Sequence, residues 1–193
     1  MPDNVRLLLI LLCICVVGYI IFNMVDSAIS DNLEDKSIGI MYKQQNALIK
    51  DSAAMKQFLE QHLDETYQRT GDLVYAMDGK PDQVIPIDTD KKAAIDMALQ
   101  GMGAMKLSEY SRGINGIKHS PDLKYAYVST AETSKGMITF TLAPEKTTSM
   151  WFESASNCID TITIVHGTTH WLATQCKQKI ALFEKAPPAP AAQ

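Results

Sequence analysis

The sequence predicts an α+β domain, with helices packed on one face of a curved antiparallel sheet, behind an N-terminal transmembrane helix. Three observations lead to this prediction. An uncharged apolar run lies at the N-terminus, two segments with helical periodicity follow it, and Thr, Ile, Val and Tyr dominate after Ser108, with turns at intervals. Helices followed by a run of strands are typical of α+β folds.

Length and charge narrow the class of protein. The chain has 193 residues, a net charge of −4 and 46% hydrophobic residues. This length predicts one domain with short appendages, and the hydrophobic content is that of a globular protein. No cluster of Lys and Arg stands out apart from the sparse "KQK" at 177–179. A nucleic-acid partner needs a basic face, so the composition argues against one.

The N-terminal apolar segment predicts a membrane anchor. Residues 7–25 form an uncharged stretch of 19 residues, which just spans a hydrocarbon core of about 30 Å. Arg6 precedes it and acidic residues follow it, so the N-terminus is expected in the cytoplasm. We therefore expect residues 1–25 to cross a bacterial inner membrane once, with a periplasmic C-terminal domain. The alternative is a signal peptide cleaved near Ser30, although the run is longer than a usual signal-peptide core.

Two helices are expected after the anchor. Residues 26–37 are polar and acidic and form a short stalk. From about residue 38 to 67 the apolar residues recur with helical spacing, which predicts one long helix. Residues 88–107 predict a second helix, with Asp88 or Thr89 as N-cap and Asp90 favourable at its positive end.

The rest of the chain is expected to form strands. Residues 72–77 suit a short strand, whereas the Gly and Pro residues of 78–86 argue against a long regular element there. Further strands are predicted over 109–119, 125–133, 137–143, 149–165 and 169–183. The folded domain is therefore predicted over 38–185, and residues 186–193, "APPAPAAQ", are expected to be a disordered tail.

The last two predicted strands carry two cysteines and form a hairpin around Gly167. Cys158 and Cys176 each lie nine residues from this glycine. In that register they face each other, with Cβ atoms about 4.5–5.5 Å apart, and a non-hydrogen-bonded pair brings them closer, as a disulfide needs. An exported domain favours oxidation. We predict a disulfide; two buried thiols, or a metal site near His166 and His170, are the alternatives.

A resemblance to a known family rests on several of these segments. The residues that carry it are Ser120, Pro121, Asp122, Lys124, Ala126, Val128, Cys158, Asp160, Thr161 and Cys176. Over about residues 40–183 the pattern resembles the NTF2-like superfamily, in its exported SnoaL-like branch. The resemblance implies a cone, in which a bent sheet wraps a helix layer around a pocket. The layout of anchor and periplasmic domain also resembles the VirB8-like proteins of type IV secretion systems.

Four residues are candidates for such a pocket: Asp160, His170, Tyr110 and Trp171. Asp160 interrupts the apolar alternation of its strand, as a pocket carboxylate would, although a rim position or a cross-strand contact with Thr174 also accounts for it. The same register places His170 opposite Ile164, where a core or rim histidine is the alternative to a general base. Trp171 also fits core packing.

The expected function follows from these features. The sequence has no P-loop, GxSxG, HExxH or paired CxxC motif, so we assign no catalytic residue, metal ligand or cofactor. We expect a non-catalytic binding or assembly module of an envelope complex such as a type IV secretion system, with protein partners or as a homo-oligomer. The alternative is a small-ligand binder or isomerase-like enzyme that uses the cone, which the resemblance allows. An empty or filled-in cone with no buried carboxylate or histidine would exclude that alternative.

Overall fold

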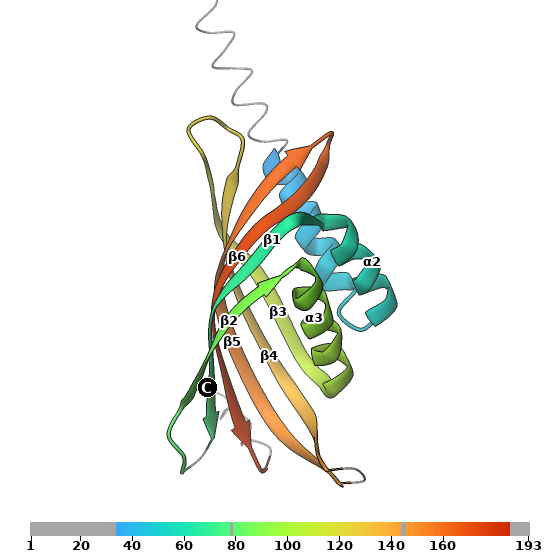
Figure 1. Ribbon diagram of the computed structural model, residues 1–193, viewed down its shortest axis with the longest axis vertical. Coiled ribbons are helices and arrows are strands. Elements are labelled where there is room, and N and C mark those ends of the chain that lie inside the picture. Colours follow the sequence, from blue (N-terminus) through green and yellow to red (C-terminus); the bar gives the residue numbers. More distant parts are fainter. Residues whose placement is uncertain (1–33, 78, 144–145, 186–193) are drawn as a thin grey trace, which may run out of the picture. The chain divides into compact units, whose positions relative to one another are not determined.

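The computed structural model describes residues 34–77, 79–143 and 146–185 (Figure 1). The chain divides into two units, Met1–Ile40 and Met41–Gln193, and the sheet, its covering helices and the cavity all belong to the second. The predicted anchor at residues 7–25 and the tail at 186–193 lie outside the described residues. Among the described residues, no helix is long and apolar enough to cross a membrane.

One curved sheet forms the frame of the second unit. Its strands are β1 (Leu63–Met77), β2 (Gln83–Asp90), β3 (Met105–His119), β4 (Ala126–Ala143), β5 (Lys146–Val165) and β6 (Thr168–Phe183). Their order across the sheet is β2-β1-β6-β5-β4-β3. The strands pair in antiparallel fashion except for β1 and β6, which are parallel. The expected run of antiparallel strands is therefore correct for β3 to β6, and β1 is the exception.

Helices α2 (Ser52–His62) and α3 (Lys91–Ala104) lie on one face of this sheet (Figure 1). Residues 34–47 are also helical. Each labelled helix begins at an aspartate whose carboxylate accepts a backbone N–H of the first turn: Asp51 from Ala54 at 3.0 Å and Asp90 from Ala93 at 2.8 Å. Such N-caps satisfy donors that the helix leaves free. Helices on one face of a curved sheet confirm the predicted α+β class.

The long helix expected over residues 38–67 is two helices and the start of a strand. The helical residues end at 47, Asp51 caps the next helix, and α2 ends before Leu63. The prediction for residues 63–67 was wrong because β1 begins at Leu63, which pairs with Trp171 of β6, and from Gln68 onward the strand is bonded to both β6 and β2. The strand expected over 72–77 is thus the second half of a strand of 15 residues.

The interruption expected over 78–86 is shorter than predicted, because among its described residues only 79–82 lie outside a strand, and the one expected between 133 and 137 is absent. Residues 83–90 form β2 although Pro86 lies within it. This strand is at the sheet edge, where a residue without an N–H is tolerated. Gly136 does not end a strand either, because β4 continues through it. A Cβ at Gly136 would lie 2.2 Å from the carbonyl oxygen of Lys106, so the glycine permits a close approach of β3.

The concave face of the sheet is packed with large side chains at both ends. Ile138, Phe152, Ile180 and Leu182 form a buried cluster, with Leu73, Met105 and further apolar residues packed against it. At the other end Trp171 lies edge-to-face with Tyr42 and with Phe58, at centroid distances of 5.5 and 6.0 Å. The face between these two clusters is hollow.

Candidate ligand cavity

A cavity of about 530 Å³ lies between the sheet and the helices. Its lining is drawn from α2, α3 and from each of the six strands, so it is the interior of the fold. Most of the lining is apolar: Met55, Leu59, Leu63, Leu73, Ile87, Ala94, Met97, Ala98, Met102, Met105, Leu107, Ile138, Phe140 and Ile180. Polar side chains are gathered mainly on the sheet wall.

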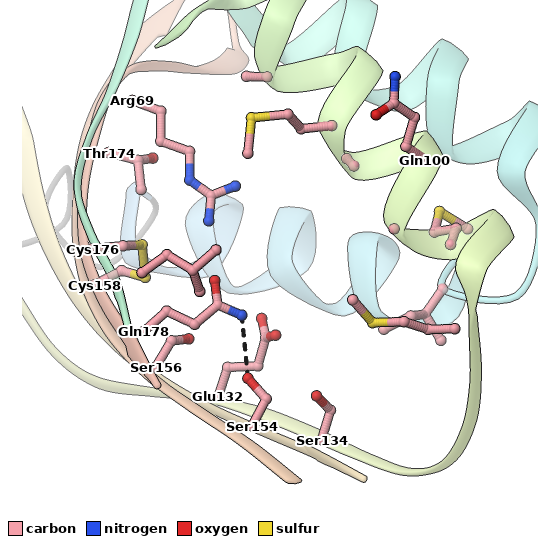
Figure 2. Close-up of a pocket in the computed structure, with 18 of the residues that line it drawn as sticks. Arg69, Gln100, Glu132, Ser134, Ser154, Ser156, Cys158, Thr174, Cys176 and Gln178 are labelled. Carbon is pink, nitrogen blue, oxygen red and sulfur yellow. Dashed lines mark hydrogen bonds between the residues drawn. A yellow bond between two sulfur atoms is a disulfide. The ribbon is translucent and has the colours of Figure 1, made fainter. Parts of the chain in front are cut away.

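The predicted disulfide is part of this wall. Cys158 and Cys176 are bonded to each other, with Cα atoms 4.2 Å apart, and both line the cavity (Figure 2). The bond is confirmed, and it removes the alternatives of two free thiols or a thiolate metal site. The predicted register holds for Cys158 with Cys176 and for Asp160 with Thr174. His170 instead faces Thr163, not Ile164, because the register shifts between Thr161 and Ile162.

Asp160 lines the cavity and is fully buried, with 0% of its surface exposed. Its Oδ2 accepts hydrogen bonds from the Tyr42 hydroxyl and from Arg112 Nη2, the latter at 3.1 Å. Its Oδ1 accepts from Thr174 Oγ1 at 2.6 Å. Both oxygens are therefore occupied, by donors from a helix and from β3 and β6.

The partners of Asp160 are themselves held in place. Arg112 Nη1 donates to Gln45 Oε1 at 2.7 Å, and the guanidinium carbon lies 4.8 Å from the centre of the Tyr42 ring. Trp171 Nε1 donates to the Tyr42 hydroxyl at 3.3 Å. Burial, and then the charge of Asp160, raise the pKa of Tyr42 far above its usual value, so the phenol stays a donor. We refer to Tyr42, Arg112, Asp160 and Thr174 as the Asp160 cluster.

Further along the wall, Tyr110 donates to Glu132 Oε2 at 3.2 Å. Burial and the neighbouring carboxylate raise the pKa of Tyr110, which keeps this donor protonated. Gln178 Nε2 donates to Ser154 Oγ at 3.2 Å, and Ser134 and Ser156 lie on the same wall (Figure 2). These groups offer a ligand several hydroxyl, amide and carboxylate positions on one side of an otherwise apolar space.

Arg69 differs from the other charged residues of the wall. It lies on β1 between Thr89 of β2 and Thr174 of β6, and its side chain projects into the cavity (Figure 2). Its Nε atom is buried without a hydrogen-bond partner, and so is Oγ1 of the neighbouring Thr89. Within the described part of the chain the Arg69 guanidinium has neither a hydrogen bond nor an ion pair.

The four pocket candidates predicted from the sequence do not all line the cavity. Asp160, Tyr110 and Trp171 line the cavity, whereas His170 is not part of its lining. Arg69, Arg112 and Glu132 were not anticipated. Strand alternation alone places Arg112 on the same face as Tyr110, so this one was accessible from the sequence.

Comparison with known proteins finds matches for the structure of this chain but not for its sequence. No protein-family model matches the sequence, and no curated protein matches it. Solved structures do match. LinA is 9% identical, with a TM-score of 0.51 over 81% of this chain and 94% of that one. A hexachlorocyclohexane dehydrochlorinase (LinA) type 2 is 8% identical, with a TM-score of 0.50 over 83% and 95%.

Structures described as NTF2-like are also among the matches. One is an NTF-2 like protein of unknown function from Silicibacter pomeroyi DSS-3, at 10% identity and a TM-score of 0.46 over 75% of this chain and 95% of that one. The domain shares its fold with LinA, and the structure described as NTF2-like matches it at a lower TM-score. At these identities the similarity concerns the fold alone, and the function has to be argued from the cavity of this chain.

Proposed function

We propose that this NTF2-like domain binds a small, mostly apolar molecule inside its cone and acts as a binding module rather than an enzyme. In this proposal residues 7–25 anchor the chain in a bacterial inner membrane and the domain lies in the periplasm. The observation that carries the proposal is the cavity of about 530 Å³ with an apolar lining and a polar wall. Small-molecule sites typically have about 300–1,000 Å³ and this division of chemistry.

The lining suits an apolar body of variable shape. Met55, Met97, Met102 and Met105 contribute unbranched thioether side chains, which adapt to irregular surfaces more readily than branched ones. The polar wall can fix the orientation of a ligand through a few hydrogen bonds. A ligand of this kind gains most of its affinity from apolar contact and its selectivity from the wall.

Binding is favoured over catalysis because Asp160, the fully buried carboxylate of the wall, has both oxygens occupied. Acid–base catalysis needs a group within hydrogen-bond reach of the substrate proton. Asp160 receives three donors, and Glu132 receives Tyr110. The described lining contains no histidine. We therefore assign no catalytic role to Asp160, Tyr110, His170 or Trp171.

Photolabelling of the full-length protein tests this proposal. Diazirine derivatives of decanoate and decanol are added over a concentration series, irradiated, and the labelled peptides are mapped by mass spectrometry. We expect saturable labelling of cavity-lining peptides by at least one of the two probes. Ala98→Phe fills part of the cavity and should reduce it, whereas Ala53→Phe, an exposed position on α2, should not. Labelling that is absent, or equal in both variants, would contradict the proposal.

A role in assembly is the second candidate, and one observation favours it. The edge strand β2 exposes two apolar side chains, Val84 at 61% and Ile85 at 45%. An edge strand with exposed apolar groups is a site where another chain can add. The partner would be a protein of the same envelope complex, such as a secretion system, or a second copy of the chain.

Site-specific crosslinking distinguishes these partners. A photoreactive residue in place of Val84 should trap a neighbour in intact membranes, whereas the same residue in place of Asp72, an exposed position on β1, should not. An adduct of twice the chain mass would indicate a homo-oligomer, and a larger mixed adduct an envelope partner. Equal or absent trapping at both positions would contradict a role for β2 in assembly.

A further inference from the structure

The Arg69 side chain has no hydrogen-bond or ion-pair partner among the described residues. Its neighbours across the sheet are threonines, not carboxylates. Thr174 already donates to Asp160, so its hydroxyl proton is engaged. The Nε of Arg69 and the Oγ1 of Thr89 are both buried without partners. Two adjacent polar groups that lack partners are unusual in a folded domain, where buried polar atoms are nearly always paired.

The other charges of the wall do not compensate Arg69. Arg112 is paired with Asp160 at 3.1 Å. Burial lowers the pKa of Arg112, but the charges of Asp160 and Glu132 act in the opposite direction, and the pKa lies above its usual value. Glu132 therefore lies in the field of Arg112 and accepts a hydrogen bond from Tyr110. The four charges of the wall sum to zero, but Arg69 is the one that forms no hydrogen bond or ion pair with the described residues, and it lies at the β1 side of the wall.

A ligand that fills the cavity displaces the water that reaches the Arg69 guanidinium. An apolar ligand would then leave a cation buried without an acceptor, which is strongly unfavourable. A ligand with an anionic group would replace the lost water by charge-assisted hydrogen bonds, and these are stronger in a dry site than in solution. A ligand that fills the cavity therefore also has to supply an acceptor for the Arg69 guanidinium.

We infer that the cone binds an amphipathic carboxylate, whose carboxylate pairs with Arg69 and whose apolar body lies against α3. One guanidinium balances one charge, and its planar fork matches a carboxylate. The side chains of α3 that line the cavity, among them Met97 and Met102, supply the apolar surface. Tyr67 lies on the same wall two residues before Arg69, and burial raises its pKa, so its phenol remains a donor. This inference rests on the proposed function and names its ligand class.

The two photoprobes separate this inference from the proposed function. They have the same chain and differ in the headgroup, so the ratio of their half-saturating concentrations reports recognition of the charge. In the wild-type protein the decanoate probe should label the cavity at about tenfold lower concentration than the decanol probe, as expected for one charge-assisted pair. Arg69→Gln should remove this preference, and Arg69→Lys should keep part of it. Lys118→Gln removes a positive charge from an exposed position on β3 and should change nothing.

Each outcome decides the inference. Preference for the acid in the wild type that is lost in Arg69→Gln and kept in Lys118→Gln supports it. Equal labelling by acid and alcohol in the wild type overturns it, while the proposed cavity binding stands. A preference for the acid probe that survives in Arg69→Gln also overturns it, because a group other than Arg69 then binds the carboxylate. Absence of cavity labelling by both probes overturns the inference together with the proposed function.

Discussion

Two arginines lie on the wall of the same cavity, and their surroundings are opposite. Arg112 meets a carboxylate, an amide oxygen and an aromatic ring, and through Asp160 it connects a helix to β3, β5 and β6. Arg69 has no such partner, and its side chain points into the cavity. A buried charge whose partners all come from the protein holds elements together. A charge without partners contributes little to folding, and it remains available to a ligand.

The largest loss of unfolding free energy is expected when the Asp160 side chain is removed. Asp160→Ala leaves Arg112 buried without its carboxylate, and breaking a buried pair in this way typically costs about 3–5 kcal/mol of unfolding free energy. Chemical denaturation of the full-length protein measures this loss. Asp72→Ala on the exposed face of β1 should stay within about 0.5 kcal/mol. A loss of similar size in both variants would contradict a structural role for the Asp160 cluster.

Loss of the disulfide should have the second-largest effect on the unfolding free energy. Replacing Cys158 and Cys176 by alanine removes a crosslink between residues 18 apart, which the chain-entropy estimate values at about 3 kcal/mol. Denaturation midpoints measured with and without reductant provide the control, because only the wild type should respond to reductant. A variant as stable as the oxidised wild type would show that hairpin pairing alone sets the register.

The N-cap of α3 should have a smaller effect. Asp90→Ala removes the carboxylate that accepts from Ala93, and loss of an N-cap typically costs about 1 kcal/mol. Asp88→Ala changes an exposed aspartate two residues earlier and makes the matched control. Equal losses in the two variants would mean that α3 does not begin where Asp90 places it.

Arg69 should show the smallest effect on stability. Arg69→Met replaces an unpartnered buried polar group by an apolar side chain of similar length, which is expected to change the unfolding free energy by less than about 0.5 kcal/mol or to increase it. The same denaturation assay measures it beside Arg112→Met, which strands Asp160 and should be strongly destabilising. A large loss in Arg69→Met would assign a structural role to Arg69 and remove the contrast between the two arginines.

The parts of the fold that could be predicted from the sequence depend on local rules. The hairpin around Gly167 follows from a two-residue alternation and a turn, so the opposition of Cys158 and Cys176 was within reach. The N-cap of α3 was expected at Asp88 or Thr89 but lies at Asp90, so the helix was predicted and its exact start was not. The shift at Ile162 was not predictable, since the alternation does not encode a bulge, and it moved His170 away from its expected partner.

The parts that could not be predicted depend on contacts between distant segments. Tyr42 and Asp160 lie 118 positions apart, and neither sequence neighbourhood indicates the other. Arg69 was missed for a different reason: it follows a stretch whose apolar spacing suggested a helix up to residue 67. Only the pairing of β1 with β2 and β6 shows which face of the strand carries Arg69.

One measurement compares the two arginines directly. The chain contains three arginines, Arg6, Arg69 and Arg112, so the ¹H–¹⁵N spectrum of the arginine Nε groups is simple, and Arg69→Lys and Arg112→Lys assign it. On titration with decanoate we expect the Arg69 signal to shift saturably, while the Arg112 signal stays in place and decanol has a much smaller effect. An unchanged Arg69 signal, or equal shifts of both arginines, would contradict the central claim that the unpaired arginine receives the ligand.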